Sequence, residues 1–100
     1  KDYPTAIKEY KHLIQTDTAY YLALFNIAYI KQFHQSEADS AIYFYQSALS
    51  IEPECVKCWH NLGLVYKDRN DRPNALKCFS KALKYNPDYI LSREEADKLR

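Results

Sequence analysis

The feature that most constrains the fold is an internal repeat of about 34 residues. The segment SAIYFYQSALSIEP (residues 40–53) aligns with NALKCFSKALKYNP (residues 74–87) at a constant offset of 34 residues. Small and aromatic positions recur together, and both copies end in a proline, Pro53 or Pro87. A unit of this length cannot bury its apolar face alone, so the repeat predicts structural units that stack on one another.

Each half of the repeat has the periodicity of an amphipathic helix. Upstream of the first pair, LFNIAYI (residues 24–30) aligns with WHNLGLV (residues 59–65). Both segments place their matching residues at i, i+3, i+4 and i+7, which lie on one helical face. A partial third copy, in which Ala6, Tyr10 and Leu13 precede their counterparts by 35 residues, opens the chain. The predicted helices cover residues 3–16, 19–34, 37–51, 55–69 and 72–86, and a short helix begins near residue 89.

Two helix starts are indicated by their residues. Ser36 followed by Asp39 resembles a capping box, with Asp in place of the usual Glu. Asp71 stands before Arg72 and Pro73, and an acidic cap followed by proline in the first turn is typical of a helix N-terminus. We therefore expect a side-chain cap at each of these two positions.

The second copy has a specific motif. Its residues at the recurring positions are Trp59, Leu62, Gly63, Tyr66, Ala75, Phe79, Ala82 and Pro87. In this pattern the sequence resembles the tetratricopeptide repeat family, whose motif combines these residue types at these spacings. The preceding copy is looser, with Leu24, Ile27, Ala28 and Lys31 in the first four positions. Gly63 and Ala28 are expected to be small because the two helices of a hairpin touch there.

The resemblance implies an all-α fold, an α-α superhelix of stacked helix-turn-helix hairpins. Residues 19–54 and 56–89 would form two complete repeats, residues 1–17 the second helix of a preceding repeat, and residues 90–100 a C-terminal capping helix. Leu91, Ala96 and Leu99 would form the apolar stripe of that cap.

The N-terminal helix has an apolar stripe that lacks the first helix of its hairpin. The stripe consists of Ala6, Ile7, Tyr10, Leu13 and Ile14. We expect the chain to be a fragment of a longer array, or to self-associate through this stripe.

The segment CVKCWHNLGLVY, residues 55–66, resembles the start of a zinc or redox site. A zinc site needs about four ligands, and only Cys55, Cys58 and His60 could converge, since Cys78 falls on the next helix. A thioredoxin-like motif needs a βαβ setting. We therefore interpret the cysteines as free packing residues, with no metal and no cofactor, and a partial metal site or a redox role stays open as an alternative. An odd count of three cysteines and the lack of a signal-like segment favour a reducing, cytoplasmic location.

Catalysis has no obvious basis in the sequence. His12, His34 and His60 are scattered, and Gly63, the single glycine, lies inside a predicted helix. The chain is therefore not expected to be an enzyme. A net charge of +1 does not favour nucleic acid, and no apolar run approaches the roughly 20 residues of a membrane span. The predicted function is a scaffold that binds another protein.

The resemblance also implies where a partner would bind, because the first helix of each hairpin lines the concave groove in this family. Groove-facing residues lie off the packing stripe. In the first complete repeat they are Leu22, Phe25, Asn26, Tyr29 and Phe33, and in the second they are Lys57, His60, Asn61, Leu64 and Lys67. A peptide or helix with apolar anchors and an acidic group would complement this surface.

Several alternatives stay open. Phe25 and Tyr29 could pack against a missing N-terminal helix instead of a ligand. Asn26, Asn61 and Lys57 match part of the carboxylate clamp by which co-chaperone tetratricopeptide domains hold a C-terminal Asp. The chain could also be an oligomerisation segment, or a regulatory domain of a larger enzyme.

Overall fold

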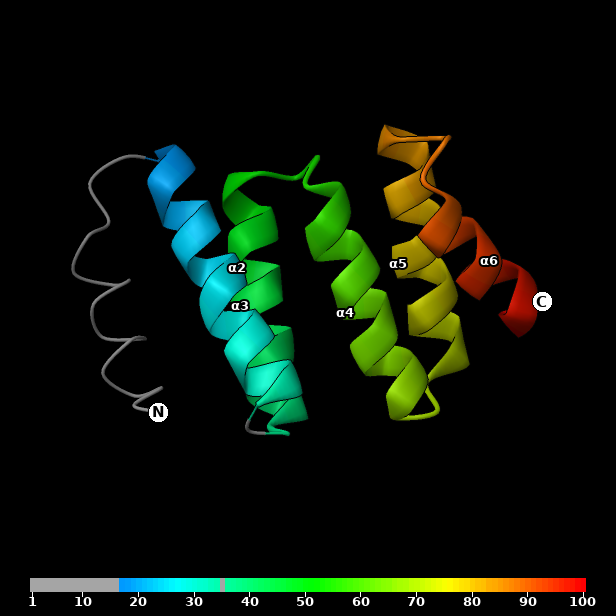
Figure 1. The fold of residues 1–100 in the computed structure, drawn as a ribbon, viewed down its shortest axis with the longest axis horizontal. Helices are drawn as coiled ribbons and strands as arrows, with labels where there is room; N and C mark the ends of the chain where they lie inside the picture. The colour runs from blue at the N-terminus through cyan, green and yellow to red at the C-terminus, as the bar shows by residue number, and fades with distance from the viewer. Residues whose placement is uncertain (1–16, 35) are drawn as a thin grey trace. The chain divides into compact units, whose positions relative to one another are not determined.

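The computed structural model describes residues 17–34 and 36–100, and within them all regular secondary structure is α-helical (Figure 1). The chain divides into two compact units, Lys1–Pro53 and Glu54–Arg100. The predicted helix at residues 3–16, with its stripe of Ala6, Ile7, Tyr10, Leu13 and Ile14, lies outside the described residues. The prediction of an all-α fold built from helical hairpins is confirmed.

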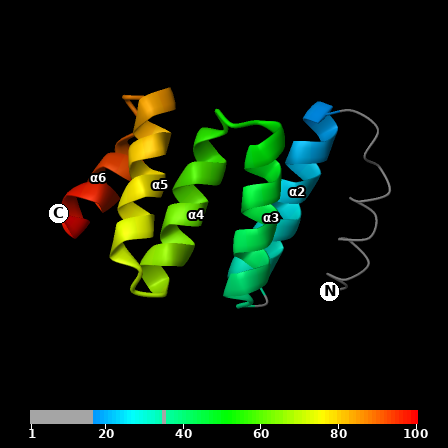
Figure 2. The same cartoon turned by 180° about the vertical axis from the view of Figure 1, so that it is seen from behind.

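The first unit contains a hairpin of α2 (Asp17–Phe33) and α3 (Ala38–Ile51), which pack side by side (Figure 2). Most of the predicted stripe is buried on both helices. On α2, Leu24, Ile27 and Ala28 are buried and Lys31 is partly exposed, and on α3, Ala41, Tyr45 and Ala48 are buried. Ala23 and Leu49 are also buried. The Tyr45 hydroxyl donates a hydrogen bond to Gln32 Oε1 at 2.5 Å, which satisfies its one polar group inside the hairpin.

The second unit repeats this hairpin with α4 (Val56–Asp68) and α5 (Arg72–Tyr85). The contact between the two helices is closest at Gly63. A Cβ atom at this position would lie 2.6 Å from Cε1 of Phe79, and the Phe79 ring is fully buried. The expectation that Gly63 must be small is therefore confirmed, and Ala28, in the matching position of the first unit, is also fully buried.

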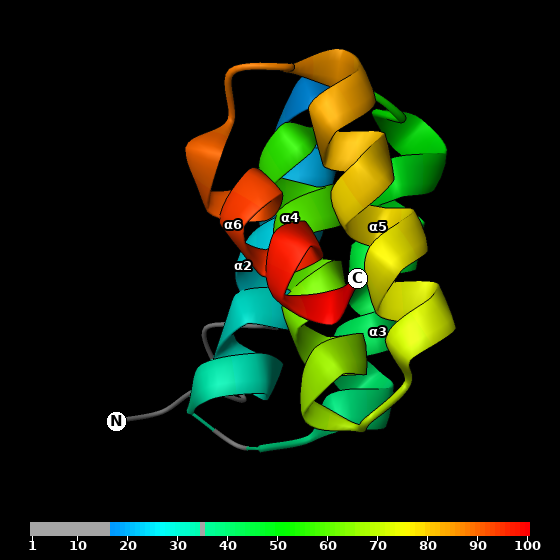
Figure 3. The same cartoon turned by 90° about the vertical axis from the view of Figure 1, so that its right-hand side faces the viewer.

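The second unit also contains α6 (Ile90–Leu99), which packs against α5 and makes side-chain contacts with α4 (Figure 3). Ala96 completes a core with Ala75 and Phe79, and Leu99 packs against it. The expected apolar stripe of α6 is wrong in one position. Leu91 is exposed and the neighbouring Ser92 is fully buried, because Ser92, one turn before Ala96, shares its helical face.

The helix starts follow the sequence in one case and depart from it in another. Asp71 caps α5 as expected, and its side chain accepts a hydrogen bond from the backbone N–H of Asn74 at 3.3 Å. The capping box expected at Ser36 is wrong. Ser36 adopts a positive φ of 51°, and the cap falls on Glu37, which makes no side-chain capping bond. The left-handed backbone at Ser36 moves the helix start one residue further along the chain.

Candidate protein-binding surface

The predicted binding residues on α2 form a surface that we call the α2 face, and most of it is exposed. Leu22 is 47% exposed, Tyr29 43% and Phe33 51%, and Asn26 is also exposed. Large apolar side chains are more often buried, so three of them on one helix face make the α2 face the candidate surface.

Aromatic contacts hold the α2 face together. The ring centroids of Tyr29 and Phe33 are 4.7 Å apart, and those of Phe25 and Tyr29 are 6.3 Å apart. Phe25 also contacts the buried Tyr45, at 5.8 Å between centroids. Ring contacts at these separations are favourable beyond the area that they bury. Phe25 therefore links the hairpin core to the exposed pair, and Tyr29 and Phe33 form the accessible end of this aromatic row.

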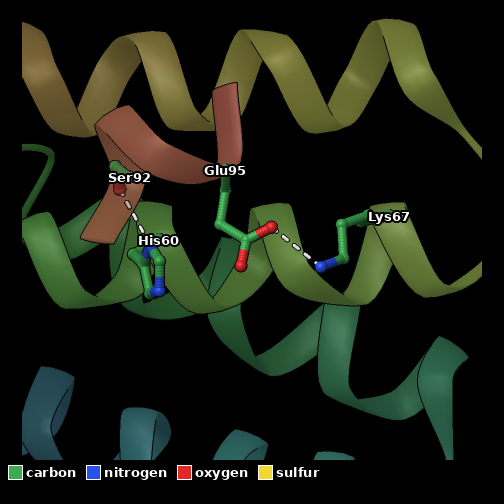
Figure 4. A network of polar contacts seen from close by, with 4 residues as sticks. All are labelled: His60, Lys67, Ser92 and Glu95. Carbon is green, nitrogen blue, oxygen red and sulfur yellow. Dashed lines mark hydrogen bonds and ion pairs between the residues drawn. The ribbon is translucent and has the colours of Figure 1, made fainter. Parts of the chain in front are cut away.

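The predicted binding residues on α4 form the α4 face, and here α6 covers much of the surface. His60 is only 8% exposed, and its Nδ1 shares a hydrogen bond with Ser92 Oγ at 2.8 Å (Figure 4). The His60 ring also contacts the rings of Phe79 and Tyr89, with centroids 5.6 and 5.4 Å away. The structure thus places His60 in a contact between helices of the same unit.

Burial has a direct effect on the ionisation of His60. Desolvation lowers the pKa of the imidazole, and the positive charge of Lys67 lowers it further, whereas Glu95 opposes the shift. Burial outweighs the carboxylate, because a charged ring inside the contact would lose its water without gaining a direct ionic partner. The neutral imidazole is the form that fits the contact with Ser92.

Lys67, about two turns after His60 on the same face of α4, is also held by α6. Its Nζ forms an ion pair with Glu95 Oε1 at 2.8 Å (Figure 4). The hydrogen bond from Lys67 lowers the pKa of Glu95, and this effect outweighs the partial desolvation of the carboxylate. The sequence did not predict that Ser92 or Glu95 contacts α4, and their spacing of three residues on α6 is the only pattern that could have indicated it.

The other members of the α4 face differ in exposure. Lys57 is exposed, Asn61 is partly exposed, and Leu64 packs against the core formed by Ala75, Phe79 and Ala96. Lys57 and Asn61 are thus the polar residues of the α4 face that reach solvent and for which no contact with α6 is described. The α2 face belongs to the first unit and the α4 face to the second.

The cysteines differ from the expectation drawn from the sequence. Cys55 and Cys58 are joined in a disulfide bond, so the prediction that all three cysteines are free is wrong. The reason is local: Cys55 caps α4 and Cys58 follows in its first turn, which brings their Cα atoms to 5.2 Å. Cys78 is free and buried, and burial raises the pKa of its thiol to about 12.

The part of the chain that the structure describes offers neither a cluster of metal ligands nor a membrane-spanning helix. No three His, Cys, Asp or Glu side chains there lie close enough together to hold a metal ion. None of the helices from α2 to α6 is both long enough and apolar enough to cross a membrane.

Comparison with known proteins agrees with the helical hairpins. The family model of the tetratricopeptide repeat matches residues 56–89. The chain is 27% identical over 103 residues to "Tetratricopeptide repeat domain-containing protein PYG7, chloroplastic" of Arabidopsis thaliana, covering 100% of this chain and 34% of that protein. It is 38% identical over 64 residues to "Superkiller complex protein 3" of Homo sapiens, covering 64% of this chain and 4% of that protein.

A third relative is an "N-terminal acetyltransferase A complex subunit-like protein" of Schizosaccharomyces pombe. It is 44% identical over 41 residues, which are 41% of this chain and 6% of that protein. Helical hairpins with this motif define a class of helical repeat proteins. Residues 56–89 match the tetratricopeptide repeat family, and two of the similar proteins are named for this repeat. It spans about a third of the first relative's length and less than a tenth of the other two.

Proposed function

We propose that the chain is a non-catalytic scaffold that binds a peptide or helix of a partner protein, chiefly through the α2 face. The observation that carries the proposal is the exposed aromatic row that ends in Tyr29 and Phe33. Rigid aromatic side chains give a large contact area with little loss of conformational freedom on binding, and they are enriched at binding hot spots.

The neighbouring side chains suggest the chemistry of the partner. Leu22 adds an exposed aliphatic group and Asn26 an exposed amide on the same helix. An apolar anchor in the partner would cover the rings, and a backbone group of the partner would bond the amide. On the other unit, Lys57 and Asn61 provide donors for an acidic group. His60, Leu64 and Lys67 are held by contacts within their own unit, so the proposal does not depend on them.

The names of the relatives support a scaffold role. Two of them are named as components of protein complexes, the Superkiller complex and an N-terminal acetyltransferase complex. A repeat protein that takes part in such assemblies does so by presenting surfaces to other chains. Which partner this chain takes is set by its own exposed side chains, since the same fold supports many functions.

A displayed peptide library, panned against the purified chain, tests the proposal. We expect enriched peptides to carry aromatic or aliphatic anchors, and we expect Tyr29→Ala with Phe33→Ala to remove most of this binding. Tyr43→Ala is the matched control, because Tyr43 on α3 is also an exposed tyrosine. Binding that survives the double variant, or that is lost equally in the control, would show that the α2 face is not the binding surface.

A further inference from the structure

We propose that Cys55 and Cys58 form a reversible thiol–disulfide site at the start of α4, which exchanges with thiol reductants. The structure joins their sulfur atoms in a disulfide bond. The bond closes a loop that contains only Val56 and Lys57. Such a short loop constrains the unfolded chain less than a long one would, so stabilisation of the fold is a weak reason for this bond.

The two sulfur atoms differ in accessibility. Cys55 precedes α4 and is partly exposed, whereas Cys58 lies in the first turn and is fully buried. Exchange requires that an external thiolate reach one sulfur of the disulfide. The geometry therefore makes Cys55 the sulfur that is attacked and Cys58 the sulfur that leaves.

The helix N-terminus stabilises the Cys55 thiolate that exchange releases. The backbone N–H of Cys58 points at Cys55 Sγ, with the nitrogen 3.2 Å from the sulfur. The unpaired N–H groups of a first helical turn carry partial positive charge and favour a thiolate. Lys57 adds a positive charge within this turn, the first turn contains no acidic residue, and Glu54 lies in the exposed turn before it.

The reduction proceeds in two balanced steps. An external thiolate attacks Cys55 Sγ and forms a mixed disulfide, while the bond to Cys58 breaks and Cys58 leaves as a thiolate. A second thiolate then attacks the reductant's own sulfur in the mixed disulfide and releases the Cys55 thiolate. The reductant leaves as a disulfide, two electrons reduce the protein, and both cysteine thiolates are free to take up protons. Oxidation by glutathione disulfide is the same sequence reversed.

Cys78 is the internal control for this site. It is free, buried and located on α5, and burial keeps its thiol protonated. A reagent that reacts with any cysteine in a loosened fold would label Cys78 together with the other two. Selective reaction of the pair therefore reports on the site, and reaction of all three reports on unfolding.

The test equilibrates the folded chain with reduced and oxidised glutathione, and in parallel with dithiothreitol, followed by acid quenching, alkylation in denaturant and measurement of intact mass. We expect one alkylated cysteine in the oxidised protein and three in the reduced protein, with full interconversion while circular dichroism shows a folded chain. If both glutathione and dithiothreitol reduce the bond, the site exchanges with monothiols. If only dithiothreitol reduces it, the site requires a dithiol. A bond that is reduced only in denaturant, or that never forms with glutathione disulfide, would overturn the proposal.

Two variants test the assigned roles. Cys58→Ser should leave Cys55 carrying one glutathione as a lasting mixed disulfide, whereas Cys55→Ser should leave Cys58 without glutathione in the folded chain. Cys78→Ser should exchange as the unchanged protein does. In the reduced, unchanged protein, Cys55 should react with iodoacetamide at least about tenfold faster than Cys78. Equal rates for these two thiols would contradict the proposal even if a variant failed to fold.

Discussion

The two hairpins carry equivalent first helices, α2 and α4, whose outer faces are used differently. The α2 face presents exposed aromatic rings, Tyr29 and Phe33 among them. On the α4 face, His60 and Lys67 are engaged by Ser92 and Glu95 of α6. One repeat position can thus carry either an exposed apolar surface or a contact with the next helix of the same unit, and the side chains decide which.

The chemistry of each face fits its use. A polar contact that is satisfied on both sides holds a helix in one register, because any other register leaves a buried group unpaired. The His60–Ser92 pair has this property for α6. Exposed rings have no such requirement and can accept partners of different sequence. Four predictions test this contrast, from the largest expected effect on stability to the smallest.

The largest effect is expected at the contact inside the α4–α5 hairpin. Gly63→Leu would drive a side chain into the buried Phe79 ring, which already lies 2.6 Å from a Cβ placed there. Overpacking of this kind lowers the free energy of unfolding by about 1–3 kcal/mol. Thermal unfolding followed by circular dichroism measures it. Ala28→Ser, a smaller change in the matching position of the first unit, is the control, and an unchanged melting temperature for Gly63→Leu would contradict the repeat alignment.

A smaller effect is expected where α6 meets α4. Ser92→Ala removes the hydrogen-bond partner of His60 Nδ1, and the net contribution of one such bond to the free energy of unfolding is about 0.5–1.5 kcal/mol. Tyr45→Phe in the first unit removes a hydrogen bond to Gln32 in the same way and provides the comparison. Urea unfolding of both variants measures the two effects. If Ser92→Ala is as stable as the unchanged chain, the His60 contact does not hold α6.

Acid should weaken the second unit in two separate pH ranges. The folded state resists protonation of His60, because its pKa is lowered, while the unfolded chain takes up the proton near the ordinary value of 6.5. The free energy of unfolding therefore falls as the pH drops below 6.5, until the folded pKa is reached. Glu95 has a pKa below the ordinary 4.5, so its contribution is present above 4.5 and is lost as the pH falls through the lowered value.

The two ranges can be separated by substitution. Urea unfolding at a series of pH values should show that His60→Gln removes the decrease that begins near 6.5, while Glu95→Gln removes the decrease below 4.5. A pH profile that neither substitution alters would mean that other groups govern acid sensitivity.

The smallest effect on stability is expected on the α2 face. Tyr29→Ala with Phe33→Ala removes rings that are about half exposed, so the free energy of unfolding should change by only about 0.5 kcal/mol for each. Differential scanning calorimetry beside the peptide-binding assay measures both properties. A large loss of stability would assign the two rings to the core, and the α2 face would then resemble the α4 face.

Much of the fold could be predicted from local pattern. The spacing of Leu24, Ile27 and Ala28 indicated a buried helix face, and these residues are buried. The small residue at position 63 indicated a close helix contact, which Phe79 makes. Periodicity predicts such features well because the apolar face of a helix must be covered.

The candidate site could be predicted less completely. The α2 face was identified because its aromatic residues fall off the packing stripe, but the sequence had no means of showing that α6 engages His60 and Lys67. Ser92 and Glu95 lie about 30 residues further along the chain, and nothing local to them indicates which helix they contact. The disulfide was likewise missed, because the odd count of cysteines argued against pairing.

The sequence by itself determined the helical hairpins of this protein, the repeat motif of residues 56–89 and the small residue at the closest contact between helices. These features follow from the spacing of apolar and small residues along the sequence, which determines the buried face of a helix and its contact with a neighbouring helix. Only the tertiary structure decided which polar side chains are exposed to solvent and which are engaged in contacts between helices. That outcome depends on which distant groups meet a given helix face and remove its water, and the burial of His60 by Ser92 and Tyr89 is the clearest instance.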